Sequence, residues 1–197
     1  DGLGAGVGIG KAGDWVALFD ADGSRVDAVT FGAVGSSIVR TANGWTTAKP
    51  TFGKLNQPTQ PAALTNLVIN EWLADPAEGG RDWLELYNPD ANAPALITGL
   101  HIRVDQQIDG LHRIATIPPR GHMRVWLDTR PGPGHVDLSL PADGATITLI
   151  TSEGVEFATM KYARQRNGVS EGRRPDGSSG RSEEHTSELQ SHLNLVC

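Results

Sequence analysis

The stretch Leu67–Asp90, LVINEWLADPAEGGRDWLELYNPD, decides the fold. It opens with an apolar, β-branched run and closes with Trp83–Tyr87, which alternates with period two, so that Leu84 and Leu86 share one face. Between the two runs, Asp75–Gly80 is rich in the Asp, Pro and Gly residues that form turns. The stretch therefore predicts two β-strands joined by a turn.

The composition favours an all-β protein. The 197 residues include 24 Gly and 12 Pro but only two Met, a balance typical of turn-rich β-structure in one or two domains. The net charge of −6 provides no electrostatic attraction for nucleic acid, so a nucleic-acid partner is not expected. No apolar run approaches the roughly 20 residues of a membrane-spanning helix, so no membrane span is expected.

Eight short segments after residue 66 have strand patterns with turn signals between them, which is typical of a β-sandwich. They lie near residues 67–73, 82–88, 95–104, 111–117, 122–128, 136–140, 145–151 and 155–162. The predicted core consists of Leu84, Leu86, Leu100, Ile102, Ile114, Val125, Leu127, Ile147, Leu149 and Phe157.

The chain contains an internal repeat, in which the first 44 residues align with residues 136–177. Ile9–Leu18 matches Leu140–Leu149, and in both copies an acidic residue and a Gly then form a turn before a second strand. The sequence therefore predicts two equivalent hairpins, one near the start of the chain and one near its end.

The order of motifs around the opening stretch resembles the bacterial lamin-tail domain family. The matching pieces are Val68-Ile69-Asn70-Glu71, Asp75-Pro76, Asp82–Asn88, Leu96–Leu100 and Ile117–Gly121. The resemblance implies an immunoglobulin-like β-sandwich present as tandem partial copies.

The repeat, the resemblance and the C-terminal sequence divide the chain into four segments. Residues 1–57 are expected to be the C-terminal half of a first domain, 58–65 a Pro-rich linker, and 66–180 a second domain that lacks its last strand. Residues 181–197 are the in-frame translation of a DNA sequence that is common as a short-read sequencing adapter, and we exclude them from the domains. The alternative is an ordinary polar helical tail.

The resemblance also implies a function and a location. The chain is expected to be a non-catalytic binding or structural module of a larger secreted or cell-surface bacterial protein. Its partners would be a protein or polysaccharide ligand and the neighbouring domains of the same chain. The alternative is a targeting or accessory domain of an extracellular enzyme, such as a nuclease, a phosphatase or a spore-coat-kinase-like protein.

Residue patterns for catalysis are missing from the sequence. His101, His112, His122 and His135 lie on separate predicted strands or loops, and neither G-x-S-x-G nor H-E-x-x-H occurs. Glu71 and Glu85 would suit an acid–base pair, but both belong to the strand motif. The sequence therefore predicts no catalytic residue and no cofactor.

Calcium is the only metal for which the sequence offers candidate ligands. Asp75, Glu78 and Asp82 cluster in one predicted loop, and calcium prefers several oxygen ligands in one place. No D-x-D-x-D-G loop occurs, and acidic residues at turns are usually solvated caps. We therefore predict no metal site, with these three residues as the calcium candidates.

Two surface features remain as binding candidates. Trp83 is predicted to lie on the face opposite Leu84 and Leu86, where it would either stack on a sugar ring or pack against the linker. A basic cluster follows the last predicted strand and is interpreted as an exposed hairpin end rather than a nucleic-acid surface. Its members are Arg164, Arg166, Arg173 and Arg174.

Overall fold

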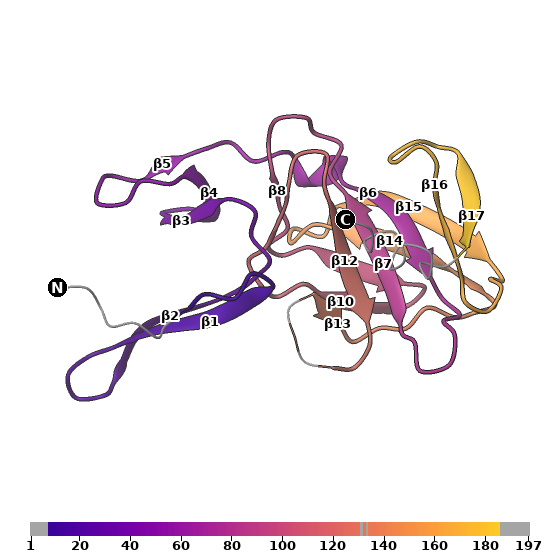
Figure 1. Ribbon diagram of the computed structural model, residues 1–197, viewed down its shortest axis with the longest axis horizontal. Helices are drawn as coiled ribbons and strands as arrows, with labels where there is room; N and C mark the ends of the chain where they lie inside the picture. The colour runs from indigo at the N-terminus through magenta and orange to yellow at the C-terminus, as the bar shows by residue number, and fades with distance from the viewer. Residues whose placement is uncertain (1–7, 131, 133, 186–197) are drawn as a thin grey trace, which may run out of the picture.

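The computed structural model describes residues 8–130, 132 and 134–185, and for residues 183–185 the backbone alone. Regular structure in these residues is almost entirely β (Figure 1). Their one helical element is the 3-10 helix η1 (Leu64–Asn66). The prediction of an all-β fold is confirmed.

Two sheets form the main body. The larger sheet contains, in spatial order, β13 (His135–Val136), β12 (His122–Leu127), β7 (Asp82–Tyr87), β6 (Val68–Leu73), β16 (Val169–Arg173) and β17 (Arg181–His185). The smaller sheet contains β10 (Gln107–Gly110), β9 (His101–Val104), β14 (Gly144–Ile150) and β15 (Glu156–Ala163). A short pair, β8 (Ala95–Leu96) and β11 (Thr116–Ile117), lies beside them.

The core fills the space between these sheets, as in a β-sandwich. Trp72 on β6 meets Tyr162 on β15 with 6.1 Å between ring centroids, and both side chains are buried. Leu84 and Leu86 are 0% exposed, which confirms the period-two assignment. Nine of the ten predicted core residues are buried, and Phe157 is half-buried against the same cluster.

The N-terminal part forms two small sheets that extend from the main body (Figure 1). One is the hairpin β1 (Gly13–Phe19) and β2 (Arg25–Gly32). The other contains β3 (Ser37–Thr41), β4 (Gly44–Lys49) and β5 (Gln57–Pro58). The hairpin joins the main body through backbone hydrogen bonds such as that from the Gly32 N–H to the Ile114 carbonyl, 2.7 Å.

The hairpins β1–β2 and β14–β15 share their register. Gly13 and Gly144 open them with φ angles of +119° and +113°, and an added Cβ would collide with the facing backbone in both. An irregularity in pairing follows Leu18 in the first hairpin and Leu149 in the second, at the positions that the repeat aligns. The sequence similarity is thus matched by the same local geometry.

The two hairpins differ in what covers their apolar faces. Ile147 and Leu149 are 0% exposed inside the sandwich. The aligned residues Val16 and Leu18 are 41% and 61% exposed, so the first hairpin has an open face where the second has a core.

The linker, predicted to be Pro-rich and semi-rigid, is hydrogen-bonded to neighbouring segments. Its start continues β5, which pairs with β4, and the Thr59 N–H donates to the Thr47 carbonyl at 2.8 Å. Further along, the Ala62 N–H donates to the Pro94 carbonyl at 3.0 Å. Backbone hydrogen bonding therefore attaches residues 57–62 at both ends.

Several predicted strands have different bounds in the structure. The segment 95–104 is split into β8 and β9 by a turn in which Gly99 has a φ of +77°. Residues 107–110 form β10 rather than a loop, and 169–173 form β16, for which no strand was predicted. Both additions are short and lack clear alternation, so their pairing comes from tertiary context.

One more strand follows Gly180, the predicted end of the second domain. Arg181–His185 forms β17, which pairs antiparallel along all of β16. Such pairing uses backbone groups and therefore tolerates a polar sequence. Arg181 adds a side-chain hydrogen bond to the Lys161 carbonyl, 2.7 Å, and lies 5.7 Å from the ring centre of Trp72. Residues 186–197 lie outside the described part.

Deleting Arg181–Cys197 is expected to lower the free energy of unfolding by roughly 1–3 kcal/mol. The deletion removes the strand pairing and the contacts of Arg181, and chain entropy recovers part of the loss. Urea unfolding of the full chain, a chain ending at Gly180 and a control chain ending at His185 measures the effect. Equal midpoints for the first two would show that β17 contributes nothing.

Candidate functional site: a groove with a Trp–Arg ladder

The outer face of β7 and β12 presents large planar side chains. The strands pair so that Trp83 faces Trp126, Glu85 faces Arg124 and Tyr87 faces His122. Between these positions, inward-facing residues such as Leu84 and Val125 fill the core. Alternation on two paired strands therefore places the planar and charged side chains together on the surface.

Three of these outward side chains and a neighbouring arginine form an alternating stack. The guanidinium carbon of Arg124 lies 4.7 Å from the ring centre of Trp83 and 5.3 Å from that of Trp126. Arg81 lies 5.8 Å from the ring centre of Trp126 on β12. At these distances a cation is attracted to the face of an indole ring. We call Arg81, Trp126, Arg124 and Trp83 the Trp–Arg ladder.

The ladder borders a groove of about 800 Å³. Trp83, Arg124 and Trp126 line it together with the loop at residues 76–81 and the segment Asn167–Val169. This volume lies in the range of sites that hold ligands of drug size or a few sugar units.

Side-chain and backbone hydrogen bonds connect the two loops of the groove. Asn167 donates its amide to Asp75 Oδ1 at 2.9 Å and to the Pro76 carbonyl at 3.1 Å. The Gly168 N–H donates to the Asp75 carbonyl at 2.6 Å. The groove is therefore held by contacts that exist without a ligand.

Asp128 anchors one end of the ladder. Its carboxylate lies 3.5 Å from Arg81 and bonds to His135 Nδ1, and the His135 ring stacks on Trp126 with 6.5 Å between centroids. Burial is the largest single influence and raises the pKa of Asp128. The hydrogen bonds with His135 and the Arg130 N–H, together with the charges of His135 and Arg81, outweigh it, so the pKa is lowered. A carboxylate that stays ionised holds Arg81 in place.

A polar cluster lies at the other end of the same face. Asn70 sits at an irregularity in the β6–β7 pairing, and its amide donates to Glu85 and to Asp176, each at 3.1 Å. The Gly177 N–H donates to Asn70 Oδ1 at 3.0 Å, and His122 lies 3.2 Å from Asp176. Asn70 thus joins the loop after β16 to the sheet.

Glu71 and Glu85 are engaged in separate contacts. Ser170 Oγ donates to Glu71 at 2.6 Å, whereas Glu85 accepts from Asn70. Both contacts connect strands, as expected for structural members of the strand motif.

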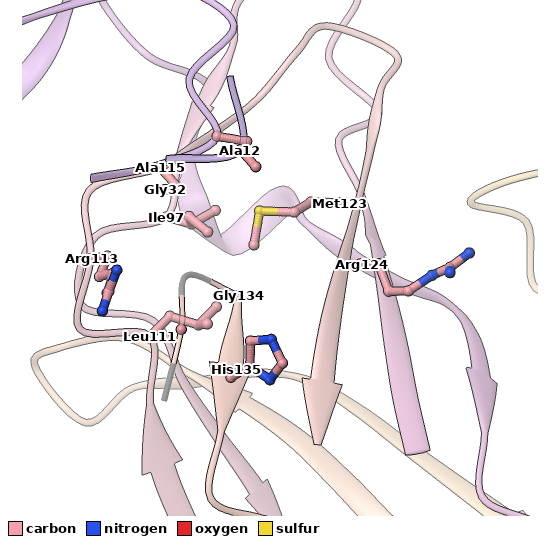
Figure 2. A pocket seen from close by; sticks show the side chains of 12 residues that line it. Ala12, Gly32, Ile97, Leu111, Arg113, Ala115, Met123, Arg124, Gly134 and His135 are labelled. Carbon is pink, nitrogen blue, oxygen red and sulfur yellow. The ribbon is translucent and has the colours of Figure 1, made fainter. Parts of the chain in front are cut away.

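A second, smaller pocket of about 150 Å³ lies where the N-terminal segment meets the main body. Figure 2 shows the Met123 side chain in this pocket near Ile97 and Ala12, while Arg124 points away from it. Met123 and Arg124 are successive residues of β12, so they project to opposite faces of the sheet. The pocket is smaller than usual ligand sites, and the groove is the better candidate.

The structure does not bring the calcium candidates together as ligands. Asp75 accepts from Asn167, and Asp82 on β7 accepts from the Leu140 N–H at 2.7 Å, while Glu78 is exposed at the groove. Burial raises the pKa of Asp82, and the charge of Asp75 adds to this. In the described residues, no group of three or more His, Cys, Asp or Glu side chains is arranged to hold a metal ion.

Calcium at millimolar concentration is expected to leave the melting temperature unchanged. A cation that binds the folded state raises this temperature by mass action, but Asp75 and Asp82 already have hydrogen-bond donors as partners. Differential scanning fluorimetry with calcium and with magnesium provides the test. A rise with calcium alone would restore the site at Asp75, Glu78 and Asp82.

The four histidines considered as catalytic candidates have different partners and do not come together. His101 Nδ1 is 3.1 Å from the Gly99 carbonyl, and His112 Nε2 is 3.3 Å from Asp109. His122 belongs to the Asn70 cluster and His135 to the anchor of the ladder.

The basic cluster is also divided. Arg164 lies 3.5 Å from Asp143, whereas Arg173 donates to the Ile69 carbonyl at 2.7 Å. The hydroxyl of nearby Tyr162 donates to the Pro141 carbonyl at 2.9 Å inside the protein. Arg164 and Arg173 therefore have separate partners, and the aromatic ring beside the cluster is buried.

Comparison with family models, curated proteins and solved structures finds no match to this chain. Over the described residues, the chain contains no helix of the length and apolarity that crossing a membrane requires. The site is therefore interpreted from its own geometry.

The sequence interpretation singled out Trp83 but missed its partners. His122, Arg124 and Trp126 alternate with the predicted core residues Val125 and Leu127. Extending the period-two argument from Trp83 to this strand would have identified them.

Proposed function

We propose that the chain is a non-catalytic module of a larger secreted or cell-surface bacterial protein, and that the groove binds a polysaccharide. The observation that carries the proposal is the pair Trp83 and Trp126, which face each other across two strands in an open groove. Sugar rings pack their apolar faces against indole rings, here against the exposed parts that Arg81, Arg124 and His135 leave uncovered. Guanidinium groups donate to sugar oxygens.

The rigid setting of the site supports binding. The two indoles stand on β7 and β12, two paired interior strands of the larger sheet, and the guanidinium of Arg124 lies beside both rings. A site that is already ordered loses less conformational entropy when a ligand binds.

The same proposal includes the lamin-tail-like architecture with tandem copies. The common register of β1–β2 and β14–β15 supports it, as does the opening glycine of each hairpin. The open face at Val16 and Leu18 is what the closing half of a sandwich would present without its opening half. Residues 1–57 would then be that half of a first domain.

Affinity gel electrophoresis tests the binding function. The full chain and the double variant Trp83→Ala/Trp126→Ala are run in gels that contain neutral or acidic soluble polysaccharides. We expect at least one polysaccharide to retard the wild type but not the double variant. Equal mobility in every gel, or equal retardation of the two proteins, would contradict the proposal.

A further inference from the structure

Arg124 is the ladder member whose charge is not paired with a carboxylate in the described part of the chain. Glu85 faces it across the strands, but the Glu85 carboxylate accepts from Asn70 and lies 4.0 Å from His122. Within the described part of the chain, no carboxylate lies within 4.0 Å of the exposed Arg124 guanidinium. Arg81 differs, because Asp128 already pairs with it at 3.5 Å.

Among the residues that the structure describes, the ladder contacts hold the guanidinium and leave its N–H groups without a hydrogen bond. The contacts with Trp83 and Trp126 are to ring faces, at 4.7 and 5.3 Å. The N–H edge of a guanidinium fits the two oxygens of a carboxylate, and a stacked guanidinium is already oriented for such a pair.

We propose that the groove selects polysaccharides whose rings carry carboxylates, with Arg124 as the residue that binds the carboxylate. This inference rests on the proposed polysaccharide-binding function and names its ligand class. In a uronic acid polymer, ring and carboxylate belong to the same sugar unit. A unit that lies along the groove therefore meets the Arg124 guanidinium with its carboxylate and the uncovered part of an indole with its ring.

The charge distribution favours this ligand over a nucleic acid. Among its described lining residues, the groove presents only Arg124 as an uncompensated cation, and the exposed carboxylate of Glu78 belongs to the same lining. Nucleic-acid affinity depends on several phosphate contacts, which one guanidinium does not supply.

The test compares two forms of one polymer by isothermal titration calorimetry. Polygalacturonate carries free carboxylates, and its fully methyl-esterified form has the same rings without the charge. We expect the wild type to bind the acid form at least about tenfold more tightly, and Arg124→Gln to remove this difference. Arg124→Lys keeps the charge but not the planar fork, so it should restore only part of the preference.

The other outcomes distinguish a failure of the carboxylate preference from a failure of the polysaccharide-binding function. Equal binding of both forms, or binding of neutral polysaccharides alone, would overturn the selection for carboxylates and leave the polysaccharide-binding function standing. Failure of all polysaccharides would overturn both. Tighter binding of a single-stranded oligonucleotide than of polygalacturonate would also overturn the inference. Urea unfolding of the Arg124 variants checks that a loss of binding does not come from misfolding.

Discussion

Leu86→Ala is expected to lower the free energy of unfolding by about 2–5 kcal/mol. Leu86 is 0% exposed and lies on the central strand β7, where the substitution leaves a cavity between the two sheets. Ordinary domains have only about 5–15 kcal/mol of total stability, so the variant should unfold at much lower urea concentration.

Glu85→Gln is the matched control on the opposite face of the same strand. The Gln side chain retains an oxygen that can accept from Asn70, and we expect a cost within about 1 kcal/mol. Greater damage from this variant than from Leu86→Ala would contradict the assignment of the inner and outer faces.

The double variant Trp83→Ala/Trp126→Ala is expected to weaken polysaccharide binding about 100-fold, because central aromatic side chains each contribute about tenfold or more at such sites. Its fold should persist, since both side chains lie on the outer face of the sheet. Titration of the polysaccharide that retards the wild type measures the effect.

Trp45→Ala is the control for this loss. Trp45 also has an arginine over its ring, Arg40 at 4.9 Å, but it lies on β4, outside the groove. Its replacement should leave the affinity unchanged. A similar loss in Trp45→Ala would place the ligand elsewhere.

The inner and outer faces of strand β7 could be predicted from the sequence, because period-two alternation depends on local backbone geometry alone. Leu84 and Leu86 alternate with Trp83 and Glu85, and the structure places the two pairs on opposite faces as predicted. The hairpin turn at Gly154 was equally local, with a φ of +83°.

The ladder depends on information that the sequence does not contain. Trp83 and Trp126 are brought together by the register of β7 against β12, and a shift of one residue would turn one of them into the core. The position of Arg81 also depends on Asp128, which directly follows β12, and on His135 in β13, which bonds to Asp128. Such contacts follow from the packed fold.

The edge strand β17 was missed for a different reason. A polar segment with little alternation carries no strand signal of its own, and backbone groups of β16 supply the partner. The side chain of Arg181 then reaches Lys161 on the other sheet.

The most direct measurement follows the indole N–H signals of the five tryptophans by NMR during a titration with the polysaccharide that binds. Substitution of each residue in turn assigns the signals. We predict that Trp83 and Trp126 shift with a common dissociation constant, while Trp15, Trp45 and the buried Trp72 do not. Shifts confined to Trp15 or Trp45, or no shift at a saturating ligand concentration, would contradict a binding site on the Trp–Arg ladder.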